Sequence, residues 1–157
     1  MNLPLIDINV EGEVDLLGLE FETLSQRSVA AAIGSAELDV PENAELSIML
    51  CDDAMIQQLN AQWRDKDKPT NVLSFPGETG DILLGDIVIS MDTVAREAAL
   101  ENKSVEDHVT HLIVHGFLHL FGYDHETDDE AVEMESLETK ILGQLGIANP
   151  YENAPQP

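Results

Sequence analysis

The sequence predicts one compact α/β domain, in which a small mixed sheet of about four strands packs against a central histidine-bearing helix and further helices. Strand-like segments lie early in the chain and helix-like segments late, with a mixture between them. No repeat, linker or low-complexity tract divides the 157 residues, and this length suffices for one domain with a real core. The histidine-bearing helix is otherwise apolar, which is typical of a buried element.

The first half of the chain is expected to contain two strands and two helices. Apolar runs predict strands at residues 3–10 and 45–50, and a helix at 17–33 for which Gly34 is the expected stop. Asp52 or Asp53 can cap the second helix, because a short carboxylate accepts the free N–H groups of a first turn. That helix should end near Trp63.

The second half is expected to contain two strands and three helices. The strands are predicted at 72–75 and 82–90. The helices are predicted at 91–101, after the capping residue Ser104 and after the capping residue Thr127. One side of the last helix is apolar, with Ala131, Met134, Leu137, Ile141 and Leu145. The domain is expected to span residues 1–150, followed by a disordered tail at 151–157.

Four of the five histidines lie within residues 111–125, and their spacing predicts a metal site. Residues four apart on a helix are neighbours on one face, so His111, His115 and His119 should line up. Two imidazoles at this spacing can bind one divalent ion, as in helical zinc motifs. The fifth histidine, His108, is interpreted as an ordinary surface or core residue.

His125 can reach the same ion only if the helix ends before it. A continuous helix would carry His125 about 9 Å along and about 240° around the axis from His119. Gly122 supplies the break, because glycine readily adopts the left-handed conformation that ends helices. His115, His119 and His125 would then give three nitrogens and leave a fourth position for water, which is the ligand set of a catalytic zinc site. Three imidazoles would also suit nickel or cobalt.

The histidine motif leaves the chemical base and the roles of His111 and Met134 undecided. Its spacing matches the metzincin proteases, but the position of their glutamate base, directly after the first histidine, is Gly116 here. A protease is therefore disfavoured, and the chemical base must lie elsewhere. His111 either forms hydrogen bonds beside the metal or has no part in the site. Met134 either lies beneath the metal, as methionines do in metzincins, or packs in the core.

The composition is that of a globular protein with an acidic surface. No apolar run approaches the ~18 residues of a membrane span, and the start of the chain lacks the basic region of a signal peptide. Cys51 is the only cysteine, which suits a reducing cytoplasm. The formal net charge of -24 should repel nucleic acid, yet Arg64, Lys66 and Lys68 are three of only seven positive charges. This local basic spot could hold a phosphate.

Three separated motifs resemble those of the YbeY family of rRNA maturation factors. They are HGFLHLFGYDH at 115–125, RDKDKPTNVLSFP at 64–76 and LGDIVIS at 84–90, and the segment EMESLE at 133–138 is also similar. The motifs occur in the order of the family, from about the second strand to the last helix. One departure is Asp65, where a small residue such as glycine is expected, and it places an acid beside Arg64.

The resemblance implies a zinc-dependent, single-strand-specific endoribonuclease with one zinc ion per chain. Such an enzyme acts on single-stranded RNA, chiefly at the 3′ end of the 16S rRNA of the small subunit, and in ribosome quality control. Its expected partners are the small ribosomal subunit and assembly or quality-control factors. By position, His115, His119 and His125 match the metal ligands of the family, Arg64 its functional arginine, and Asp86 a polar residue near the site.

In the expected mechanism, zinc-bound water or a metal-activated 2′-hydroxyl attacks the phosphodiester while the planar guanidinium of Arg64 braces the phosphate. Alternatively, Arg64 is a solvated charge paired with Asp65 or Asp67. Asp86 either accepts a hydrogen bond from a ligand histidine or lies on the polar face of an edge strand. Two other functions remain as alternatives, a non-catalytic zinc-bound ribosome assembly factor and a metzincin-like metallohydrolase without the usual glutamate.

Overall fold

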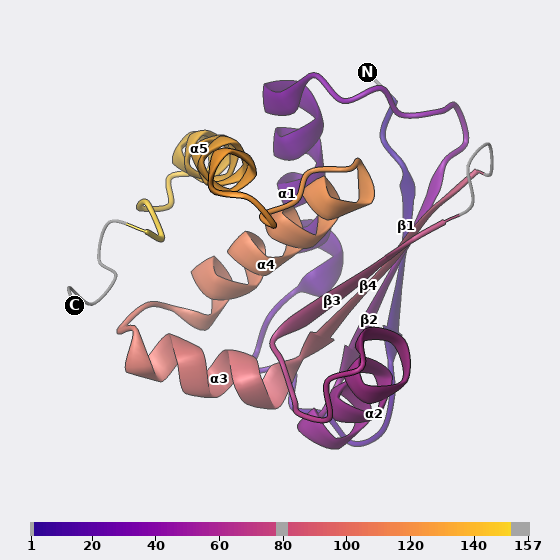
Figure 1. Cartoon of the computed structure of the whole chain (residues 1–157), viewed down its shortest axis with the longest axis vertical. Helices are drawn as coiled ribbons and strands as arrows, with labels where there is room; N and C mark the ends of the chain where they lie inside the picture. Colours follow the sequence, from indigo (N-terminus) through magenta and orange to yellow (C-terminus); the bar gives the residue numbers. More distant parts are fainter. Residues whose placement is uncertain (1, 78–81, 152–157) are drawn as a thin grey trace.

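The computed structural model describes residues 2–77 and 82–151, which form a four-stranded sheet and five helices (Figure 1). The strands are β1 (Leu5–Val10), β2 (Glu45–Cys51), β3 (Val72–Pro76) and β4 (Leu83–Ser90). Their order in the sheet is β1-β2-β4-β3, with β1, β2 and β4 parallel and β3 antiparallel to β4. The predicted α/β domain with a small mixed sheet is confirmed.

Helices cover both faces of this sheet. They are α1 (Phe21–Ala36), α2 (Asp53–Arg64), α3 (Met91–Leu100), α4 (Val105–Leu120) and α5 (Asp128–Gln144). α1 and α4 pack on one face and α5 packs against both of them, whereas α2 covers the opposite face. Figure 1 shows α4 in the middle of the molecule, between α5 and α3. None of the described helices combines the length and the apolarity that crossing a bilayer requires.

Two cores form because successive side chains of a strand point to opposite faces. Leu46, Ile48 and Leu50 of β2 join the main core under α1 and α4. Cys51 and Val88 join a smaller core beneath α2. Each fully buried leucine or isoleucine stabilises the fold by roughly 1.5–3 kcal/mol.

The same alternation determines the position of Asp86 on β4. Its neighbours Gly85 and Ile87 both face α4, because a Cβ at Gly85 would lie 2.7 Å from Leu120 Cδ2 and Ile87 Cγ2 lies 3.1 Å from the Cβ position of Gly116. Asp86 therefore points to the α2 side of the sheet. In addition, β4 is an interior strand. Neither expectation for Asp86, contact with a ligand histidine or a place on an edge strand, holds in the structure.

The expected helix caps are present at three helix starts. Asp52 Oδ1 accepts a hydrogen bond from Met55 N at 2.9 Å and begins α2. Ser104 caps α4, and Thr127 begins α5 with a reciprocal capping box. Each such cap stabilises a helix by about 1 kcal/mol, because it satisfies a backbone N–H that has no partner within the helix.

The bounds of α1 differ from the prediction at both ends. Leu17 and Gly18 have positive φ angles, so the helix begins only at Phe21. Gly34 does not end the helix, because one glycine inside a helix costs only about 1 kcal/mol. Glu37 ends it instead, with a left-handed φ of 51° and a backbone N–H that donates to Ile33 O.

The central helix α4 lies unusually close to the sheet. Ile113, Phe117 and Leu118 have no exposed surface. A Cβ at Gly116 would lie 3.0 Å from Ser74 Oγ and 3.1 Å from Ile87 Cγ2, closer than most side-chain contacts. Glycine at this position therefore allows α4 and the histidines beside it to lie directly on β3 and β4.

Candidate metal centre

The end of α4 turns the chain back toward its own histidines. α4 stops at Leu120, and Gly122 follows with a left-handed φ of 94°. Tyr123 N donates to Leu118 O at 3.2 Å, which closes the helix end, and His125 N donates to Asp124 Oδ1 at 2.8 Å. The predicted break at Gly122 is therefore present, and a loop carries His125.

Three histidine rings converge at this turn. The ring centroids are 4.6 Å apart for His115 and His119, 5.7 Å for His115 and His125, and 5.1 Å for His119 and His125. One nitrogen from each ring lies within 4.8 Å of the other two. His115 Nε2 and His119 Nε2 are 3.1 Å apart. Tetrahedral zinc with ordinary zinc–nitrogen bonds would hold two such nitrogens about 3.3 Å apart, so this donor set fits one zinc ion.

Glu138 of α5 orients the first of these histidines. Its side chain has no solvent exposure, and its Oε1 lies 2.6 Å from His115 Nδ1. A carboxylate only accepts hydrogen bonds, so the proton of neutral His115 must be on Nδ1. The Nε2 lone pair of His115 is then free and faces His119. A carboxylate behind a histidine is the usual support of a metal ligand.

Protonation at the site favours metal binding. Burial by itself would raise the pKa of Glu138, but hydrogen bonds from His111 and His115 lower it to about 2, so the carboxylate stays ionised. Burial lowers the pKa of His119, and the neighbouring His115 and His125 lower it further. His119 is therefore neutral at neutral pH, and a metal ligand must be a neutral imidazole.

His111 and Tyr151 complete the surroundings of Glu138. His111 Nε2 lies 3.3 Å from Glu138 Oε1, and the Tyr151 hydroxyl donates to Glu138 Oε2 at 2.5 Å. Tyr151 N in turn donates to Asn149 Oδ1 at 2.9 Å. Glu138 Oε1 thus bridges His111 and the candidate ligand His115, which are two hydrogen bonds apart. Tyr151 belongs to the expected tail, but the structure places it against α5, and residues 152–157 lie outside the described part.

A second group of side chains also offers three possible ligand atoms within 4.8 Å of one another. It consists of His111, His115 and Glu138. Because the Glu138 carboxylate is buried and already accepts hydrogen bonds from its neighbours, we assign it to orienting His115 rather than to binding an ion. The group of His115, His119 and His125 includes the exposed His125 and so can be reached from solvent.

Hydrogen bonds through β3 link Arg64, at the end of α2, to the helix α4 that carries His115 and His119. Its Nη2 donates to Ser74 O at 2.6 Å, and Ser74 Oγ donates to Gly116 O at 3.1 Å, one residue after His115. Within the described residues, Arg64 forms no ion pair with Asp65 or Asp67. One of its five N–H donors has a hydrogen-bond acceptor in the described part of the chain, and the others could bind a phosphate.

The backbone conformation at position 65 explains why aspartate can replace the expected glycine. It ends α2 in a left-handed conformation with φ 59° and ψ 33°. Glycine adopts this conformation without steric cost, and aspartate is among the few other residues that adopt it readily. Met134, the other open residue, is buried in the main core, and no described contact places it beneath the histidines.

The roles of Glu138 and Tyr151 were not predicted from the sequence. A signal for Glu138 was present, because it lies four residues after Met134 and three before Ile141, on the apolar side of α5. A carboxylate at such a buried position needs strong hydrogen-bond donors. Tyr151 carries no comparable signal, because only the folded chain brings it to α5.

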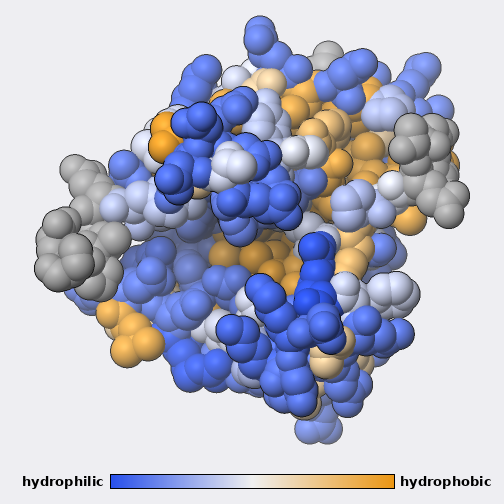
Figure 2. Space-filling view, in the orientation of Figure 1, coloured by the Kyte–Doolittle hydropathy of each residue, from blue (hydrophilic) through white to orange (hydrophobic). Residues whose placement is uncertain are grey.

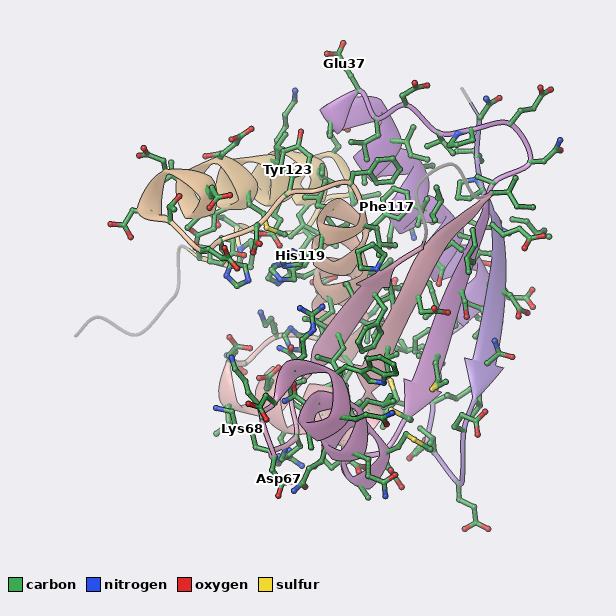
Figure 3. All side chains as sticks on the ribbon, turned by 45° about the vertical axis from the view of Figure 1, so that its right-hand side comes forward. Glu37, Asp67, Lys68, Phe117, His119 and Tyr123 are labelled. Atoms are coloured by element: carbon green, nitrogen blue, oxygen red, sulfur yellow. The ribbon has the colours of Figure 1, made fainter. Side chains whose placement is uncertain are left out.

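The candidate site lies beside a hollow in the surface. Figure 2 shows the hollow between the parts of the surface that cover α5 and those that cover α2 and α3, where Figure 1 places α4. In the side-chain view, His119 lies on the α4 side of this gap, and Lys68 lies across it (Figure 3). A flexible polymer strand could therefore reach the histidines from solvent.

Comparison with known proteins gives one consistent match. The family model described as Endoribonuclease YbeY matches residues 9–146. A Bradyrhizobium diazoefficiens protein named Endoribonuclease YbeY is 50% identical, over 98% of this chain and 88% of its own length. Its namesake in Nitrobacter winogradskyi is 56% identical over 83% of this chain and 73% of its own length. A Thermotoga maritima protein solved in solution shares the fold, with a TM-score of 0.56 and 24% identity over 94% of this chain and 99% of its own.

Proposed function

The chain belongs to the YbeY endoribonuclease family, and from that premise we propose that it is a single-strand-specific, zinc-dependent endoribonuclease. The proposed substrate is small-subunit rRNA, with maturation of the 16S 3′ end and ribosome quality control as its tasks. The small subunit and its assembly factors would be its partners. A cytoplasmic location suits the single buried cysteine. One domain would carry the activity, and it would extend past the expected boundary at residue 150 to Tyr151, which donates a hydrogen bond to Glu138.

The observation that carries this proposal is the convergence of one ring nitrogen each from His115, His119 and His125. The three imidazoles leave a position for a reacting group, as catalytic zinc sites do. Arg64 is connected to the helix of these histidines through Ser74. A phosphodiester is a group that needs both a metal ion and a planar cation beside it.

Glu138 and Arg64 would have different roles in the proposed reaction. When bound, zinc supplies a Lewis acid and lowers the pKa of a coordinated water to near neutrality. Glu138 keeps the Nδ1 proton on His115 and so directs the Nε2 lone pair to the site. Arg64 braces the non-bridging phosphate oxygens with its remaining N–H donors, which stabilises the charge that develops during attack.

The two alternatives make different predictions. A metzincin-like peptidase would need a base at position 116, but Gly116 is buried and its Cβ position points at Ser74 and Ile87 of the sheet. A non-catalytic assembly factor would need the metal only for its fold. It would bind the ribosome equally well with or without Arg64, whereas the proposed nuclease would lose cleavage without that residue.

A substrate panel tests the proposal directly. The zinc-loaded protein is incubated with single-stranded RNA, with a duplex of the same sequence and with a mixture of unstructured peptides. The proposal predicts cleavage of the single strand alone. Cleavage of peptides would support the peptidase, and intact substrates throughout would leave only the assembly role.

A further inference from the structure

The side chain of Trp63 is unusually exposed. It is the only tryptophan of the chain, it lies in the last turn of α2 directly before Arg64, and 62% of its surface is accessible. Tryptophan is usually far more buried than this, because its ring offers a large apolar area. The exposure of an indole next to a candidate phosphate-binding residue therefore suggests that the ring binds a ligand.

The indole is held in place although it is exposed. Its ring centroid lies 6.4 Å from that of Phe75, at an interplanar angle of 65°, which is a favourable edge-to-face contact. The guanidinium carbon of Arg64 lies 5.6 Å from the centroid of the same Phe75 ring. Trp63 and Arg64 thus both pack against the Phe75 ring of β3. An aromatic side chain that is already ordered loses little entropy when it receives a ligand.

The same strand connects this pair of side chains to the candidate metal centre. Phe75 follows Ser74, whose hydroxyl donates to Gly116 O at 3.1 Å and whose carbonyl accepts from Arg64. Arg64 is therefore linked through Ser74 of the edge strand β3 to α4, the helix that carries His115 and His119.

The charges around Trp63 suit a polyanion although the whole chain is acidic. Arg64, Lys66 and Lys68 follow it, and none of them forms an ion pair with a carboxylate among the described residues. Of the interleaved acids, Asp67 accepts a hydrogen bond from Gln57 at 3.0 Å. Elsewhere, Arg96 pairs with Asp53, and Lys103 pairs with Glu101. Three cations that form no ion pair among the described residues thus follow the exposed ring in the sequence.

The surroundings of Trp63 do not resemble an apolar docking patch for a protein. Within residues 2–77 and 82–151, the other strongly exposed large apolar residues lie outside α2 and β3, and they are Leu3, Leu5, Val10, Ile82, Leu100 and Val132. A protein-binding patch would be expected to group several such residues. An exposed ring that is followed along the chain by three cations is instead a combination that suits single-stranded nucleic acid.

We propose that Trp63 is a base-stacking residue, which receives one nucleobase of single-stranded RNA next to the phosphate bound by Arg64. This inference rests on the proposed function and specifies how the acidic chain engages its substrate. Every base has a π face, so the stacking contact would add affinity without requiring a particular sequence. It would also favour single strands, because the bases of a duplex are already stacked on one another.

The single tryptophan provides its own probe. The full-length, zinc-loaded protein is titrated with a short 2′-O-methyl single-stranded RNA, and with an abasic oligomer that carries the same number of phosphates. The proposal predicts saturable quenching of tryptophan fluorescence by the RNA and little quenching by the abasic oligomer. Equal quenching by both probes would overturn it.

Variants separate stacking from other roles of the position. Trp63→Ala should weaken RNA binding roughly tenfold or more, and Trp63→Phe should recover most of that loss. Leu100→Ala, which removes another strongly exposed apolar side chain, should leave the affinity unchanged. Circular dichroism verifies that all three variants are folded.

The outcomes also separate this inference from the proposed function. If Trp63→Ala binds RNA as tightly as the wild type while the wild type cleaves single-stranded RNA, the stacking role is wrong and the nuclease stands. The exposed ring of Trp63 would then be assigned to a contact with a partner protein instead of RNA. If the wild type neither binds nor cleaves single-stranded RNA, the proposed function fails, and the stacking role fails with it.

Discussion

Glu138 Oε1 lies 2.6 Å from His115 Nδ1, and the carboxylate that makes this contact is completely buried. The contact joins α5 to α4 and directs the other nitrogen of His115 toward His119 and His125. Burying a carboxylate destabilises the fold unless hydrogen bonds offset the lost hydration. The partners of Glu138 on α4 and at Tyr151 supply these hydrogen bonds.

Glu138→Gln should weaken zinc binding by about ten- to a hundredfold, which is the usual effect of removing the carboxylate behind a ligand histidine. The amide has almost the same shape, but it is neutral and does not impose the Nδ1 proton on His115. Competition with a chromophoric chelator measures the affinity. Glu133→Gln, an exposed position on the same helix, is the matched control. Equal affinities of both variants would contradict the orienting role of Glu138.

Arg64→Ala should lower the rate of single-stranded RNA cleavage by roughly a hundredfold or more, because a donor to the developing charge is lost. Zinc content and thermal stability should stay close to those of the wild type, since Arg64 is exposed. Arg64→Lys should recover only part of the rate, because an ammonium group lacks the planar fork. Full activity of Arg64→Ala would place the phosphate elsewhere.

Asp65→Asn should tighten RNA binding about two- to threefold at low ionic strength, because it removes a negative charge beside Arg64 and Lys66. Asparagine also adopts the left-handed conformation that Asp65 has at the end of α2, so the fold should be preserved. Binding isotherms at several salt concentrations measure the effect, which should fade as salt rises. Asp39→Asn makes the same charge change at a different exposed position and should have less effect.

Asp53 predicts an acid-dependent contribution to stability. Its carboxylate accepts hydrogen bonds from Ser90 and Thr93, each at 2.6 Å, and pairs with Arg96 at 2.8 Å. Burial by itself would raise the pKa of this carboxyl, but these three partners lower it below its usual value. A depressed pKa in the folded state stabilises the protein above the pKa of the unfolded chain, and that stability is lost as pH falls through the folded-state pKa.

The free energy of unfolding should therefore differ between the wild type and Asp53→Asn by a constant amount from neutral pH down to about pH 5, and the difference should shrink below about pH 4. Urea denaturation at a series of pH values measures it. Asp7→Asn, at an exposed position of β1, is the control for the removal of one carboxylate. A difference that persists unchanged in acid would show that the ion pair is not the cause.

Local patterns predicted much of this structure. Alternating and helical periodicity gave the order and type of the elements, and short polar side chains at Asp52, Ser104 and Thr127 marked helix starts that the structure confirms. The histidine spacing together with Gly122 predicted a turn that brings three rings together, because both depend only on helix geometry and one backbone conformation.

The remaining features depend on contacts between distant segments. Nothing in the sequence around Asp86 says which face of β4 packs on α4, so the sequence could not show that Asp86 points to the α2 side of the sheet. Gly34 did not end α1, because the left-handed position fell at Glu37. Glu138 and Tyr151 meet the histidines only after α5 folds across α4.

The most direct test of the account is to return zinc to chelator-stripped protein in steps while the rate of single-stranded RNA cleavage is measured. The account predicts no cleavage without metal and a rate that rises linearly to a plateau at one zinc per chain, with no recovery in His119→Ala. Cleavage that survives the chelator, or that returns equally in His119→Ala, would contradict it.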